Sequence, residues 1–199
     1  MHLPESGGLH GIAMIVDINE YELLVERGSS DDISQFARDV LIGGVAAVEK
    51  NDGEVVAFMG DAFLAVMPTP SSCGLACFQI AKDLKSQCEY FAEVRRGSSE
   101  IMPFLTDGIG MKIAVESGDI DVSTIRSRFM GEQRLLAGNC INYASRISQA
   151  GSGNRCHLGP RVAPEWPYGP ISERHQMTAK HAGKTYSYYV FDLSEIWED

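Results

Sequence analysis

The sequence predicts an α+β fold in which helices pack on one face of a mostly antiparallel sheet. Three observations support this: an unbroken apolar run at 11–17, two long segments whose apolar residues recur at i, i+3 and i+4, and short strand-like segments bounded by turn residues. A chain of 199 residues with 44% hydrophobic content can bury a sizeable core. We expect an N-terminal tail at 1–8 and one domain at 9–195.

The first half of the chain begins with a buried strand, because residues 11–17 contain no polar residue before Asp17. An amphipathic helix follows, with Ser30 as its predicted N-cap, and the turn sequence KNDGE ends it. A hairpin is expected next, with strands at 54–59 and 62–67 joined at Gly60 and Asp61.

The second half alternates helices with strands. We expect a helix at 73–94, a strand at 109–117, a helix at 138–150, a strand at 155–159, and a terminal hairpin within TAKHAGKTYSYYVFDL. The intervening segment 119–135 is predicted to be polar, irregular and protruding.

The composition excludes several classes of function. With 17 basic and 27 acidic residues the net charge is −10, which disfavours nucleic acid as a partner. The five cysteines lack metal-type spacing with histidine, and Cys73 and Cys77 are expected to be buried apolar side chains, although metal binding stays an alternative. No run reaches the roughly 18 apolar residues of a membrane span, and the N-terminus lacks signal-peptide character. We therefore expect a cytoplasmic protein without a membrane partner.

Five polar residues are candidates for chemistry, and each has a simpler structural interpretation. Asp17 ends the first strand but could cap a following helix, and Asp61 could serve only its hairpin turn. Asn142 and Arg146 are four apart on a predicted helix and could form its solvated face, and Lys180 could be an ordinary loop lysine. Two carboxylates held close together at strand ends could instead bind two Mg²⁺ or Mn²⁺ ions.

The motifs together resemble one known family. Asp17-Ile18 after the first strand, FMGDAF around Gly60-Asp61, the strand GMKIAVESGDI and the helix GNCINYASRI occur in the order and spacing of the class III nucleotidyl cyclases, which include adenylate and guanylate cyclases. The resemblance spans residues 9–193. It implies a ferredoxin-like cyclase sandwich that assembles as a homodimer with sites shared between protomers.

The resemblance also implies the roles of the candidate residues. Asp17, the backbone carbonyl of Ile18, and Asp61 would hold two divalent cations that activate the ribose 3′-oxygen and neutralise the phosphates. Asn142 and Arg146 of the other protomer would orient the ribose and meet charge at the α-phosphate. Lys180, with Lys184 as the second choice, would contact the terminal phosphates.

The sequence departs from the family at the base-reading positions. Family adenylate cyclases carry lysine and aspartate (or threonine) where this chain has Ala57 and Leu135, so the usual purine hydrogen bonds are missing. The chain therefore looks most like the stand-alone pyrimidine (Pycsar) cyclases of bacterial antiphage defence, whose cyclic product activates a separate effector protein. This implies a uridylate cyclase acting on UTP, with cytidylate, adenylate or guanylate cyclase as alternatives.

Two competing hypotheses keep part of this interpretation. A non-catalytic, nucleotide-binding cyclase-like module would explain the loss of the base readers, but retention of both aspartates, Asn142 and Arg146 favours an enzyme. A palm-type polymerase or diguanylate cyclase shares the two-metal logic, but its glycine-glycine-acidic turn is absent, because the turn here is Met59-Gly60-Asp61-Ala62.

Overall fold

The computed structural model describes residues 1–199 except 28–29, 95–109, 130, 152, 180–182 and 194–199. Its regular elements, in chain order, are β1 (Gly7–Ile18), α1 (Tyr21–Arg27), α2 (Ser30–Lys50), β2 (Glu54–Met59), β3 (Ala62–Met67), α3 (Pro70–Val94), β4 (Met111–Ser127), β5 (Gly131–Ala137), α5 (Asn139–Ser148), β6 (Arg155–Leu158), a 3-10 turn (Ala163–Glu165), β7 (His175–Thr178) and β8 (Thr185–Asp192).

The strands form one mostly antiparallel sheet. In the described part of the chain the sheet has eight strands: seven follow the order β2-β3-β1-β4-β6-β8-β7, and β5 pairs with β4 beside this path. The β4–β6 pair is parallel, and the other pairs are antiparallel. The α+β class, the hairpin strands at 54–59 and 62–67, and the terminal hairpin are therefore confirmed.

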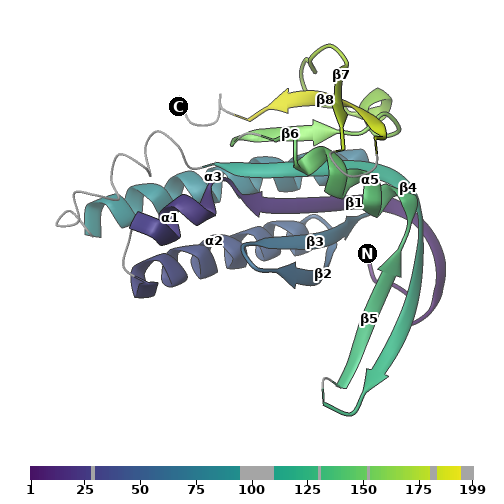
Figure 1. Cartoon of the computed structure of the whole chain (residues 1–199), viewed down its shortest axis with the longest axis horizontal. Helices are drawn as coiled ribbons and strands as arrows, with labels where there is room; N and C mark the ends of the chain where they lie inside the picture. Colours follow the sequence, from purple (N-terminus) through teal and green to yellow (C-terminus); the bar gives the residue numbers. More distant parts are fainter. Residues whose placement is uncertain (28–29, 95–109, 130, 152, 180–182, 194–199) are drawn as a thin grey trace.

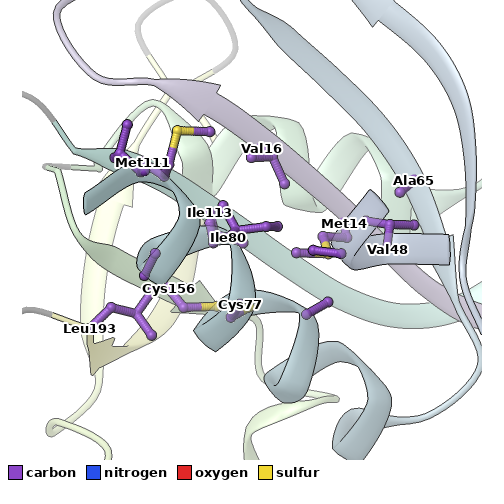
Figure 2. Packing of buried hydrophobic residues seen from close by; sticks show 14 of the residues in the cluster. Met14, Val16, Val48, Ala65, Cys77, Ile80, Met111, Ile113, Cys156 and Leu193 are labelled. Atoms are coloured by element: carbon purple, nitrogen blue, oxygen red, sulfur yellow. Dashed lines mark hydrogen bonds between the residues drawn. The ribbon is translucent and has the colours of Figure 1, made fainter. Parts of the chain in front are cut away.

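The main core lies between the sheet and the two long helices, α2 and α3. Alternate residues of the central strand face it, because side chains of a strand point to opposite faces in turn. Figure 2 shows Met14 and Val16 of β1 in this layer, together with Val48 of α2 and Ile80 of α3. These side chains are almost fully buried, so α2 and α3 share one face of the sheet as predicted.

The opposite face carries the short helix α5, whereas the sequence analysis expects the helices to pack on one face of the sheet. Its buried residues Cys140, Ala144 and Ile147 recur at helical spacing and pack on β1 and β4. The close approach depends on Gly138, since a Cβ there would lie 2.6 Å from the Asp119 carbonyl oxygen. Both faces of the sheet are therefore partly covered.

The prediction of an irregular segment at 119–135 is wrong, although the segment does protrude. β4 continues to Ser127 and pairs with β5 in a long ribbon that projects from the body of the sheet (Figure 1). Ile120 and Val122 are buried and alternate with Asp119 and Asp121, so the strand period was present but masked by polar composition.

The N-terminal segment is more ordered than a tail. β1 begins at Gly7, and the Leu3 side chain is 1% exposed in the cluster beneath α5. The backbone N–H of Leu3 donates to Glu54 Oε2 at 2.8 Å. Among the described helices, none is long and apolar enough to cross a membrane.

Candidate functional site

Asp17 lies at the end of β1, on the sheet face that also carries α5. Ile12, Met14, Val16 and Ile18 face the main core, so the alternation of the strand directs Asp17 to the other side with Ala13 and Ile15. Asp17 stands opposite Ala62 of β3 and opposite Lys112 of β4 in the ladder. Two neighbouring strands therefore fix its backbone.

Asp61 is brought beside Asp17 by the turn between β2 and β3. Gly60 has φ +71°, a left-handed conformation that glycine adopts at little cost. The turn places Asp61 just before β3, and the Ile18 N–H donates to the Asp61 carbonyl oxygen at 3.3 Å. The structure thus brings together the three predicted residues Asp17, Ile18 and Asp61.

The electrostatics of Asp17 reflect this arrangement. Burial raises the pKa of the Asp17 carboxyl, the Lys112 ammonium opposes the shift, and the negative charge of Asp61 adds to it. Lys112 Nζ lies 3.4 Å from Asp17 Oδ2, with the two side chains 21% and 29% exposed. Sequence reasoning missed Lys112, although a lone lysine in the apolar strand Met111–Val115 was a visible signal.

The donor set suits a hard divalent cation. The described residues contain no group of three or more His, Cys, Asp or Glu side chains that could hold a metal. Mg²⁺ does not require such a group, since it is commonly bound by one or two carboxylates together with water and substrate phosphates. The two aspartates and a nearby backbone carbonyl fit Mg²⁺ or Mn²⁺ on this basis.

Asn142 and Arg146 lie on the exposed side of α5. Both are exposed, whereas Cys140, Ala144 and Ile147 of the same helix are buried. Their i, i+4 spacing places them on one face of the helix. Within the described residues neither side chain has a hydrogen bond or ion pair, so both remain available to a ligand.

The fold keeps Asn142 away from the aspartates of its own chain. Asn142 lines a shallow surface hollow with Gly8, Asp119 and Asp121. Gly8 and Asp17 are nine positions apart on β1, which corresponds to about 30 Å at roughly 3.3 Å per residue. Asn142 therefore lies toward the opposite end of β1 from Asp17.

The remaining predicted site residues lie on the surface. Ala57 is exposed on β2, next to an irregularity between Val55 and Ala57, and Leu135 is 50% exposed on β5. Lys180 lies outside the described residues. Lys184, the second choice, is exposed, with its Nζ 5.4 Å from the ring centroid of Tyr186.

No family model matches the sequence, and no curated protein matches it. Solved structures do match. The guanylyl cyclase Cya2 aligns with a TM-score of 0.76 and 12% identity, covering 96% of each chain. The adenylyl cyclase CyaB from P. aeruginosa gives 0.69 and 15%, covering 95% of this chain and 97% of that one. The guanylate cyclase domain of RhGC from Catenaria anguillulae, in complex with GTP, gives 0.61 and 17%, covering 94% and 99%. The chain has the fold of these cyclase domains.

Proposed function

We propose that this protein is a nucleotidyl cyclase that converts a nucleoside triphosphate to a 3′,5′-cyclic mononucleotide and pyrophosphate. In this reaction a bond forms between the ribose 3′-oxygen and the α-phosphorus, the bond from the α-phosphorus to the oxygen bridging the β-phosphate breaks, and the 3′-hydroxyl proton passes to solvent. The observation that carries the proposal is the convergence of Asp17 and Asp61 across the β1–β3 pair.

Asp17, Asp61 and the Ile18 carbonyl would hold two divalent cations, Mn²⁺ or Mg²⁺. When bound, the cations would supply Lewis-acid activation of the attacking oxygen and charge neutralisation at the phosphates. The role of the protein would be to hold the two carboxylates in fixed positions. The ladder positions of Asp17 and the Ile18–Asp61 hydrogen bond support that role.

Asn142 and Arg146 would act on the substrate held by a second copy of the chain. The distance of about 30 Å between Gly8 and Asp17 along β1 supports a homodimer with shared sites. Asn142 would donate to the ribose. Arg146 would stabilise charge developing at the α-phosphate, because its planar fork can make two parallel hydrogen bonds.

The substrate is proposed to be UTP, with CTP as the second choice. Ala57 and Leu135 offer no hydrogen bond at the positions where the resembled purine cyclases read the base, and both side chains are exposed on the surface. A site that selects a base strongly needs polar groups matched to that base. Lys180 would contact the terminal phosphates, and the cyclic product would act as a messenger for a separate effector in antiphage defence.

The test is incubation of the purified protein with Mn²⁺ and each of the four nucleoside triphosphates, with products identified by mass. A cyclic pyrimidine nucleotide is expected, and its formation should be lost in Asp61→Asn while the thermal unfolding profile is kept. Product from ATP or GTP alone would end the pyrimidine proposal. Nucleotide binding without any product would favour a non-catalytic module.

A further inference from the structure

Asp17 and Asp61 form the acidic pair of the candidate site. Among the described residues, Lys112 is the one cation that makes an ion pair with either of them, and its partner is Asp17. It stands opposite Asp17 in the β1–β4 ladder, and its ammonium lies 3.4 Å from Asp17 Oδ2. Lys112 has no second ion pair among the described residues. Its charge is therefore directed at the carboxylate that, under the proposed function, binds metal.

The stem of Lys112 is confined rather than free on the surface. Its side chain is only 21% exposed. The loop after α5 lies over it: a Cβ at Gly151 would come within 3.1 Å of Lys112 Cγ and 3.2 Å of His157 Cε1. Burial of this kind restricts the rotamers of a long side chain, so the pairing with Asp17 is built into the packing.

We propose that Lys112 is a resident counter-cation that lowers the affinity of the nucleotide-free site for divalent metal. The inference rests on the proposed function and extends it to the regulation of metal binding. An ammonium at Asp17 Oδ2 occupies one of the two carboxylate oxygens and repels an incoming dication. Metal then binds well only when a triphosphate adds negative charge to the site.

The charges of the site support this order of events. Asp17 and Asp61 together carry two negative charges, and Lys112 removes one of them. Without phosphate, one net negative charge faces a dication, which is a weak binding arrangement at a partly exposed site. Arrival of a triphosphate restores an excess of negative charge and gives Lys112 phosphate oxygens as an alternative partner.

The test is titration of the nucleotide-free protein with Mn²⁺, followed by the electron paramagnetic resonance signal of free Mn²⁺. Lys112→Met is expected to bind Mn²⁺ about tenfold more tightly than the unmodified chain, because the competing charge is gone. Lys112→Arg keeps the charge and should remain weak. Lys50→Met, which removes an exposed lysine at the end of α2, is the matched control and should change nothing.

A second measurement keeps the inference testable if Lys112→Met folds poorly. Lys112→Gln is titrated in the presence and absence of inorganic tripolyphosphate. The anion should raise Mn²⁺ affinity more in the unmodified chain than in the variant, because only the unmodified chain has a competing ammonium to divert.

The inference is overturned if neutral variants bind Mn²⁺ no more tightly than the unmodified chain, or if Lys112→Arg gains affinity as much as Lys112→Met does. These results are independent of turnover. A shift in Mn²⁺ affinity without cyclic product from any nucleotide would end the proposed function and leave the role of Lys112 standing. Cyclic product without a shift in Mn²⁺ affinity would support the proposed function and end the proposed role of Lys112.

Discussion

Two inactive variants of this chain should restore activity when they are mixed. In a twofold dimer with shared sites, each site takes Asp61 from one protomer and Arg146 from its partner. A mixed dimer of Asp61→Asn and Arg146→Ala therefore has one site with both lesions and one site with neither. Each variant alone has a lesion in both sites.

The magnitude follows from the symmetry. Random pairing of equal amounts yields mixed dimers as about half of the total, and each has one intact site of two, so about one quarter of the original activity should return. The separation of about 30 Å along β1 between Gly8, beside Asn142, and Asp17 supports sites that are shared between protomers.

The assay is cyclic nucleotide production after the two variants are co-expressed in equal amounts and purified through a tag that both carry, so that all three kinds of dimer are present. The matched control mixes Asp61→Asn with Asp17→Asn, whose lesions fall on the same half of the site, so no mixed dimer has an intact site. Recovery in the first mixture and none in the control is expected. No recovery in either mixture, or equal recovery in both, would refute the shared-site geometry.

Three further changes test the site and its scaffold. Arg146→Lys should lower kcat about a hundredfold, because the paired hydrogen bonds are lost while the charge remains. Unfolding in urea should be unchanged because Arg146 is exposed. An unaltered kcat would contradict the proposed role of Arg146. Gly44→Ala should destabilise the fold by about 1–3 kcal/mol, since its Cβ would lie 2.7 Å from Phe63 Cε1. Gly43→Ala is the matched control, because its nearest contact is an ordinary 3.5 Å to Asp83 Cβ, and equal losses in urea unfolding would refute the packing argument. Burial lowers the pKa of His157 to about 4. As pH falls, the unfolded chain therefore takes up a proton at this residue before the folded chain does. The contribution of His157 should lower the free energy of unfolding by up to about 3 kcal/mol as pH drops from about 6.5 to about 4. The fall should be smaller in His157→Gln, measured by urea unfolding at each pH, and an identical fall would argue against burial as its cause.

Sequence reasoning succeeded where local signals were strong. The apolar run before Asp17, the helical spacing in α2 and α3, and the Gly60 turn each determine local structure with little help from the rest of the fold. The first strand and the Gly60 turn also carry the metal-site candidates, which is why Asp17 and Asp61 could be selected before the structure placed them near each other.

Sequence reasoning failed where the deciding contacts join residues that are far apart in the chain. The β4–β5 ribbon carries exposed polar residues on both strands, and its regularity comes from pairing with β1 and with itself. The face occupied by α5 depends on Gly138 meeting the backbone of Asp119. Lys112 was overlooked because its importance comes from the register that sets it opposite Asp17, and a register is not visible in one strand's sequence.

The structure also separates two kinds of site residue by how firmly they are held. The backbones of Asp17 and Asp61 are fixed by ladder pairing and by the Ile18–Asp61 hydrogen bond, and Asp17 is held in a charge environment that burial and Asp61 make unfavourable. Asn142 and Arg146 are presented on an exposed helix face without partners among the described residues. Under the proposed function, a cation would meet the carboxylates and a second chain would bring the amide and guanidinium. Burial and the charge of Asp61 at Asp17, which Lys112 offsets only in part, are then an argument that the site serves binding rather than folding.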